Sequence, residues 1–244
     1  MSDVLIPDWP APDRVRACST TRHGGVSRAP YSSFNLGDHV GDDAQAVRQN
    51  RQRLVELAGL PAEPPWLQQV HGTTVIRLDG ANTSAPCQAD GVYTRLAGQV
   101  CAIMTADCLP VLLCNRAGTE VAAAHAGWRG LSAGIIERTA ACFACDPGDI
   151  MAWLGPAIGP RAFEVGPEVK AAFVDQDKQA AGAFSPYGEK YLADIYQLAR
   201  LRLHAVGIDR VYGADHCTVT ESTLFFSYRR DGVTGRMASL VWLI

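Results

Sequence analysis

The sequence predicts a mixed-sheet α/β or α+β fold. Strand-like and helical segments are interspersed, and several strand-like segments follow one another directly, unlike the strict alternation of an all-parallel sheet. No G-x-G-x-x-G motif follows the first strand and no P-loop motif occurs, which argues against the common nucleotide-binding folds. The 244 residues contain no internal repeat, low-complexity segment or clear linker, so we expect one domain over residues 1–244.

The first half of the chain is expected to hold one helix among several strands. Residues 44–58 place apolar side chains at helical spacing between Asp43, a capping residue, and Gly59, a terminating residue. Before this helix, residues 23–43 are rich in Gly, Ser, Asn and Asp and predict a long loop, either ordered or disordered. The expected strands are residues 15–22, 66–70, 73–78, 99–105, 111–114 and 120–124, with a polar loop over 79–90.

The second half of the chain alternates further helices and strands. Apolar periodicity predicts helices over residues 131–144, 168–176 and 192–207. β-rich segments predict strands over residues 149–154, 210–217, 225–231 and 238–244, with a turn at 231–235 before the last of them.

Composition excludes several classes of protein. A net charge of -3 and a pI of about 6.1 give no basic surface for nucleic acid. No apolar segment approaches the ~20 residues that span a bilayer, and the N-terminal residues do not resemble a signal peptide. The 8 cysteines are irregularly spaced, which is typical of reduced thiols in a cytoplasmic protein. The oligomeric state does not follow from the sequence.

Three residues that suit a metal ion share one kind of position. His71, Cys108 and His125 each follow an apolar, strand-like segment, beside Gly or close to Pro. Because the ends of neighbouring strands can meet in space, the three side chains can converge. Two imidazoles and one thiolate match a catalytic zinc, which takes three protein ligands and keeps one open position. Taken alone, a buried cysteine is usually a small hydrophobic residue, and a histidine at a strand end is more often a hydrogen-bonded surface residue than a ligand.

Two other interpretations use the same atoms. Cys108 and His125 suit a nucleophile and its base, as in cysteine hydrolases, and the residues alone do not separate this from a metal site. Copper also binds two His and one Cys, but 6 histidines are too few for a trinuclear copper cluster as well. The neighbouring Asp107 is expected either to orient a ligand or to cap the turn.

Several arginines are candidates for binding an anion. Arg22 follows the first long strand, Arg129 precedes a predicted helix, and Arg229 and Arg230 follow the segment FFSY. Guanidinium groups suit phosphate or carboxylate, and a helix N-terminus adds backbone N–H donors. Each of them is also compatible with a solvated surface charge.

From residue 4 to the C-terminus, a series of motifs in fixed order resembles the YfiH family, also called the laccase-domain or polyphenol-oxidase-like purine nucleoside phosphorylase family. The motifs are STTRHGGVS, YSSFNLGDHVGDD, WLQQVHG, ADGVYT, MTADCLPVLL, AAAHAGWRG, LGPAIGP, FEVG, YLADIYQLAR and FFSYRRDGVTGRMASLVWLI.

This resemblance implies a fold, a metal and an activity. It implies a single α/β domain whose mixed sheets are layered between helices, an α-β-β-α sandwich. It implies zinc, with copper as an alternative, held by His71, Cys108 and His125. The implied activities are phosphorolysis of adenosine, inosine and S-methyl-5'-thioadenosine, and deamination of adenosine; peptidoglycan precursor editing by a cysteine-type hydrolase and polyphenol oxidation remain alternatives.

The resemblance also suggests how the substrates are held. We expect Arg22 and Arg229, and then Arg129, to hold phosphate. Ser27 and Asn35, from the long loop, are the candidate contacts to sugar or phosphate.

Overall fold

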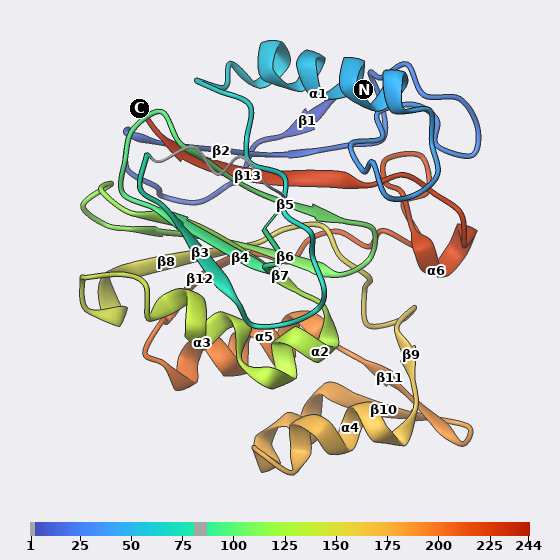
Figure 1. The fold of residues 1–244 in the computed structure, drawn as a ribbon. Coiled ribbons are helices and arrows are strands. Elements are labelled where there is room, and N and C mark those ends of the chain that lie inside the picture. Colours follow the sequence, from blue (N-terminus) through green and yellow to red (C-terminus); the bar gives the residue numbers. More distant parts are fainter. Residues whose placement is uncertain (1–2, 81–86) are drawn as a thin grey trace.

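Helix, sheet, sheet and helix form successive layers in the computed structural model, which describes residues 3–80 and 87–244 (Figure 1). Helix α1 covers a four-stranded sheet, and helices α2, α3 and α5 lie beyond a six-stranded sheet. The four-stranded sheet has the order β1 (Val4–Leu5), β2 (Val15–Thr20), β13 (Met237–Leu243), β5 (Val100–Thr105). The six-stranded sheet has the order β12 (Arg210–Gly213), β8 (Ile150–Leu154), β6 (Leu109–Asn115), β7 (Val121–Ala126), β4 (Gly91–Thr94), β3 (Val75–Leu78). The predicted layered α/β architecture is confirmed.

The remaining elements are helices and one small sheet. The α-helices are α1 (Ala44–Ala58), α2 (Trp128–Ala133), α3 (Ile135–Ala140), α4 (Pro167–Val174), α5 (Ile195–Ala205) and α6 (Tyr228–Asp231). Short 3-10 helices are η1 (Pro147–Asp149) and η2 (Lys178–Ala183). A three-stranded sheet has the order β10 (Phe184–Tyr187), β11 (Lys190–Ala193), β9 (Glu164–Val165), and it lies beside α4 at one end of the molecule (Figure 1).

Both faces of strand β5 are buried, which explains why its sequence is apolar throughout. Val100, Ala102 and Met104 belong to the hydrophobic layer that also contains residues of α1. Cys101 and Ile103 face the other way and pack between the two large sheets. Because side chains alternate along a strand and both faces of β5 are covered, the segment reads as a continuous apolar run rather than an alternating one.

The chain changes sheets between β5 and β6. Strand β5 belongs to the four-stranded sheet and β6 to the six-stranded sheet, so residues 106–108 carry the chain from one sheet to the other. The expected break in the apolar run is confirmed, but the expected start of the next strand at residue 111 is wrong. Pro110 lies inside β6, near its beginning, and its carbonyl accepts a hydrogen bond from the backbone N–H of Gly155 at 3.0 Å.

The helices follow their capping signals. The predicted helix over residues 44–58 is confirmed, with Asp43 as N-cap and Gly59 in the left-handed conformation. The predicted helix over 131–144 is instead two short helices, because Gly134 has a φ of 100° and separates α2 from α3. Helix α5 begins at residue 195 rather than 192, since the carboxylate of Asp194 caps it by accepting from the N–H of Gln197.

Two predicted strands are wrong. Residues 225–231 do not form a strand, because Ser227 caps the short helix α6 within them. Residues 66–70 contribute only an isolated bridge between Gln68 and Gln88. Strand β4 and the hairpin of β10 and β11 were not predicted. Part of the expected polar loop over 79–90 lies outside the described residues. No helix among those described combines the length and apolar character needed to cross a membrane.

Candidate metal centre and substrate cavities

The structure brings His71, Cys108 and His125 together at one end of the two large sheets. His71 lies in the loop before β3, Cys108 in the connection from β5 to β6, and His125 within β7. One ligand atom from each of the three lies within 4.8 Å of those of the others, and Sγ of Cys108 is 3.7 Å from Nε2 of His71. The imidazole rings of the two histidines meet edge-on, with centroids 4.8 Å apart. The convergence expected from the sequence is therefore present.

The buried carboxylate of Asp90 orients two of these three side chains. Its Oδ1 accepts the Nδ1–H of His125 at 2.8 Å. The other ring nitrogen, Nε2, is therefore the one directed at His71 and Cys108. The same carboxylate accepts the backbone N–H groups of Val70, His71 and Gly72 at 3.2, 2.9 and 2.7 Å. These contacts hold the loop in which His71 has a φ of 60°, a conformation that non-glycine residues seldom adopt.

Burial, neighbouring charges and hydrogen bonds shift the pKa values of Cys108, His125 and Asp90. Burial raises the pKa of the Cys108 thiol, but the adjacent His125 charge and hydrogen bonds from both imidazoles outweigh it and lower the pKa to about 6. Burial lowers the pKa of His125, but the Cys108 thiolate and Asp90 raise it to about 9. For Asp90, hydrogen bonds from His125 and the loop N–H groups outweigh burial and hold its pKa below the usual range. At neutral pH the metal-free pair is therefore a Cys108 thiolate beside a protonated His125, and a metal ion would take the place of the proton on His125.

Two glycines allow the loops to approach closely enough. A Cβ atom at position 127 would lie 2.8 Å from Cδ2 of His71 and 2.9 Å from Sγ of Cys108. A Cβ atom at position 130 would lie 2.9 Å from the backbone oxygen of Gly72. Any larger residue at either position would push the trio apart, which explains the glycines in HAGWRG.

The donor set fits one tetrahedral metal ion. Ideal zinc–nitrogen and zinc–sulfur bonds at the tetrahedral angle place N and S about 3.6 Å apart. The 3.7 Å between Nε2 of His71 and Sγ of Cys108 agrees with this separation. Three protein ligands leave one coordination position for a substrate or water, as catalytic zinc sites do.

The trio lies on the wall between two cavities. The larger, of about 500 Å³, is lined by the three ligands and by polar side chains that include His39, Gln69, Arg129 and Arg236. The smaller, of about 210 Å³, is lined by His71 and Cys108 together with a more apolar set. That set includes Trp128, Ile158, Phe163, Ile195, Tyr228 and Arg229. Arg129 and Tyr228 border both cavities.

The three arginines that were expected to hold phosphate occupy different places. Arg129 lines both cavities, and its guanidinium stacks over the Trp128 ring at 4.4 Å. Arg229 lines the smaller cavity and donates to the backbone oxygen of Glu164 at 2.9 Å. Arg22 lines neither cavity. Its guanidinium stacks over Phe226 at 4.9 Å and donates to the carbonyls of Ser32 and Ser222, so the geometry gives it a scaffolding role.

Ser27 and Asn35 also lie away from the two cavities. The hydroxyl of Ser27 donates to Asp42 at 2.6 Å, and the side-chain amide of Asn35 donates to the same carboxylate at 2.9 Å. Asn50 of α1 donates to Ser27 and to the carbonyl of Asn35. These bonds order the loop over residues 23–43, where the sequence suggested contacts to a substrate.

Asp107 does not touch the ligands, and its turn is tied to other parts of the chain. It has a φ of 92°. Its carboxylate accepts from the hydroxyl of Thr218 at 2.5 Å and from the backbone N–H of Arg229 at 2.7 Å. Of the two roles considered for Asp107, the geometry favours anchoring the turn that presents Cys108.

Sequence reasoning missed four residues of the site. Asp90 stands in the motif ADGVYT directly before a strand, which is also a common place for a turn residue. Gln69 bonds the backbone of Met104 in both directions, at 2.7 and 2.8 Å, and so fixes the His71 loop to β5. His39 and Arg236 reach the larger cavity from the long loop and from the residue before β13, respectively.

Comparisons with known proteins show the family of this chain. The family model described as multi-copper polyphenol oxidoreductase laccase matches residues 16–244. A protein named purine nucleoside phosphorylase YfiH from Escherichia coli is 60% identical over 244 residues, with 100% of both chains covered. A purine nucleoside phosphorylase from Pseudomonas aeruginosa is 54% identical over 245 residues, covering 100% of this chain and 99% of its own.

Solved structures share the fold closely. A Neisseria meningitidis protein gives a TM-score of 0.95 at 51% identity, with 99% of each chain covered. The YfiH protein of Bacillus licheniformis gives a TM-score of 0.93 at 31% identity, covering 100% of this chain and 97% of its own. The chain belongs to the YfiH family, the family described as multi-copper polyphenol oxidoreductase laccase.

Proposed function

We propose that this protein is a zinc-dependent purine nucleoside phosphorylase acting on adenosine, inosine and S-methyl-5'-thioadenosine. The observation that carries the proposal is the position of the His71, Cys108 and His125 trio between an arginine-lined cavity and an apolar one. Relatives that are 60% and 54% identical, and that align over 100% and 99% of their length, are named purine nucleoside phosphorylases, which supports it.

Phosphate fits the larger cavity. Arg129 and Arg236 both line it, and guanidinium forks suit phosphate oxygens. Arg236 is held rigidly, because its guanidinium donates to the carbonyls of Thr234 and Gly235, each at 3.0 Å. In this account these two side chains orient phosphate and offset its charge while it attacks C1 of the ribose.

The purine fits the smaller cavity. Trp128, Phe163 and Tyr228 offer aromatic surface there, and apolar walls exclude water from the leaving base. Attack by phosphate forms the C1–oxygen bond as the bond from C1 to the base nitrogen breaks, and the base leaves with the electron pair and takes up a proton. A bound zinc would supply Lewis-acid stabilisation of negative charge between the two cavities.

The experiment is product analysis. Purified protein is incubated with inosine with and without phosphate, and hypoxanthine, ribose 1-phosphate and free ribose are quantified. The proposal expects hypoxanthine and ribose 1-phosphate in equal amounts, and neither without phosphate. Cys108→Ser should abolish turnover, whereas Cys142→Ser, a matched change outside both cavities, should leave it unchanged. Release of free ribose, or no release of base, contradicts the proposal.

Adenosine deamination by the same site is part of the proposal. It predicts inosine from adenosine in the absence of phosphate, lost together with phosphorolysis in Cys108→Ser. Metal analysis of the purified protein separates zinc from copper, the alternative that polyphenol oxidation would require.

One observation favours a second candidate, a cysteine-type hydrolase or amidase such as a peptidoglycan editing enzyme. Cys108, His125 and Asp90 stand in the order nucleophile, base and orienting carboxylate. Chelation separates the two candidates, because a hydrolase of this kind keeps its activity without metal and loses it on alkylation of Cys108.

We further propose that the enzyme works in the cytoplasm on small molecules rather than on nucleic acid. The 8 cysteines of the sequence are all free, and the net charge is -3.

A further inference from the structure

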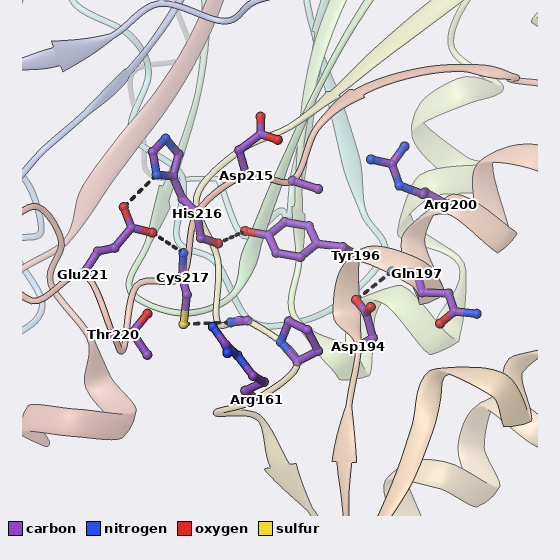
Figure 2. A pocket seen from close by; sticks show the side chains of 13 residues that line it. Arg161, Asp194, Tyr196, Gln197, Arg200, Asp215, His216, Cys217, Thr220 and Glu221 are labelled. Carbon is purple, nitrogen blue, oxygen red and sulfur yellow. Dashed lines mark hydrogen bonds and ion pairs between the residues drawn. The ribbon is translucent and has the colours of Figure 1, made fainter.

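A third cavity has a volume of about 650 Å³, and Figure 2 shows the side chains that line it. None of the three metal-binding candidates lines it. Its walls come from the loop after β8, the first turns of α5 and residues 214–221, which follow β12. Its volume is in the range of small-molecule sites. The proposed reaction gives it no role.

Cys217 presents its sulfur to this cavity among backbone donors. Its Sγ accepts the backbone N–H of Gly159 at 3.2 Å (Figure 2). A Cβ atom at position 159 would lie 3.1 Å from Sγ, so glycine permits this approach. Burial raises the pKa of the Cys217 thiol, but hydrogen bonds from Thr220 and the backbone N–H groups of Gly159 and Val219 outweigh it and lower the pKa. The surroundings therefore stabilise a thiolate.

Glu221 holds the Cys217 segment in this conformation. Its Oε1 accepts the backbone N–H of Cys217 at 2.6 Å, and its Oε2 accepts the Nδ1–H of His216 at 2.9 Å (Figure 2). The carboxylate is therefore engaged by two donors and does not stand as a bare negative charge in front of the sulfur.

The cavity also contains an uncommitted cation. Arg161 is exposed on its wall, and its side chain makes no hydrogen bond or ion pair with any residue in 3–80 or 87–244. By contrast, Arg200 on the same wall is occupied by the carbonyls of Val211 and Gly213. Arg161 is thus the side chain available to recognise a carboxylate on a ligand.

We propose that this cavity is a thiol-exchange site, in which Cys217 forms a mixed disulfide with a small disulfide carrying carboxylates, such as glutathione disulfide. The Cys217 thiol loses its proton to solvent, and the thiolate attacks one sulfur of the disulfide. The new bond to Sγ forms as the old sulfur–sulfur bond breaks, and the other half leaves as a thiolate that takes up a proton. The small disulfide is the oxidant and is half reduced.

The modified segment is linked to the metal centre. The residue after Cys217, Thr218, donates to Asp107 at 2.5 Å, and Asp107 directly precedes Cys108. Thr218 also bonds the carbonyl of Ala157 at 3.0 Å. An adduct that displaces residue 217 therefore disturbs the turn that presents Cys108, and it is expected to slow turnover.

The test uses the metal-loaded protein and glutathione disulfide at neutral pH, with adducts located by peptide mapping. Cys142 and Cys145 are internal controls, because they are also partly exposed and burial raises the pKa of each. Cys217 should form the adduct at least about tenfold faster than either control. Equal rates, or adducts on the controls with none on Cys217, overturn the proposal.

Arg161→Gln tests how the ligand is recognised. It should slow adduct formation with glutathione disulfide but not with bis(2-hydroxyethyl) disulfide, which has no carboxylate. An equal effect on both reagents, or none on either, shows that Arg161 does not recognise the carboxylate.

Turnover is then measured as a function of the fraction of Cys217 that is modified. It should fall in proportion to that fraction, and unchanged turnover at full modification overturns the link to Cys108.

Discussion

Oδ1 of Asp90 lies 2.8 Å from Nδ1 of His125, while the same carboxylate accepts the backbone N–H of His71 at 2.9 Å. One acidic side chain thus orients the ring of one metal-binding candidate and the main chain of another. Cys108 reaches the same point from the turn held by Asp107. The centre is assembled by hydrogen bonds that are complete before any cation binds.

Asp90→Asn should weaken metal binding by about 10- to 100-fold, because an amide cannot accept all four N–H groups and does not raise the basicity of His125 as a carboxylate does. Competition with a chelator of known affinity measures this. Asp43→Asn, the same change at the cap of α1, is the control, since Asn caps as well as Asp. Equal metal affinity in the two variants would contradict the role assigned to Asp90.

Gly127→Ala should remove metal binding without removing the fold. The added methyl would meet Cδ2 of His71 at 2.8 Å and Sγ of Cys108 at 2.9 Å, so the ligands must separate. Gly148→Ala is the matched control, because nothing lies within 4 Å of its Cβ position. Metal content is measured after dialysis. If the Gly127→Ala protein retains as much metal as wild type, an added methyl group does not separate the ligands, which contradicts this prediction.

In metal-free protein, Cys108 should react with iodoacetamide at a rate that rises through about pH 6 and then levels off. Above that pKa the sulfur is already a thiolate, so a further rise in pH adds no reactive form. Burial raises the pKa of Cys142, and its rate should still be increasing at about pH 9. Peptide mapping across this range gives both profiles, and parallel curves for the two cysteines would refute the thiolate assignment.

Arg129→Gln and Arg236→Gln should each raise the KM for phosphate by about tenfold or more, since each removes a charged donor from the larger cavity. Arg22→Gln should leave that KM unchanged, because Arg22 lines neither cavity. Steady-state kinetics at saturating inosine provide the values. If Arg22→Gln alone raised the KM for phosphate, the result would instead support the prediction from the sequence that Arg22 holds phosphate.

Gly134→Ala should destabilise the protein by about 1 to 2 kcal/mol, because residue 134 has a φ of 100° that an L-residue adopts only with strain. The nearest atom to an added Cβ, Oε2 of Glu137, is 3.5 Å away, so the cost is conformational rather than a clash. Urea unfolding of this variant and of Gly148→Ala gives the comparison. Equal midpoints would show that the break between α2 and α3 tolerates a side chain.

Local signals account for what the sequence predicted well. The helix over residues 44–58 carries its own cap and stop, and mixed sheets were predicted because strand-like segments follow one another directly. The layering of these sheets between helices was implied only by the resemblance to the YfiH family. The trio was predicted because thiol and imidazole groups at strand ends are chemically conspicuous. The prediction of a strand over residues 225–231 was wrong, because the aromatic residues there suit a strand equally well and only Ser227 marks the start of the helix.

The rest of the site depends on contacts between distant segments. Arg22 and Arg236 flank the adjacent strands β2 and β13, yet only Arg236 faces the larger cavity. Which way a side chain turns after a strand depends on the carbonyls within its reach, here those of Ser32 and Ser222 for Arg22. Asp90 was missed for the same reason, because its four donors come from the loop over 70–72 and from β7.

The most direct test of the central claim is turnover of inosine and phosphate as zinc is returned to the chelated, metal-free protein. The account predicts no turnover at the start, a linear rise, and a plateau at about one zinc per chain, with Cys108→Ser failing to recover at any zinc concentration. Full turnover in the metal-free protein, or recovery in Cys108→Ser equal to that of wild type, would contradict it.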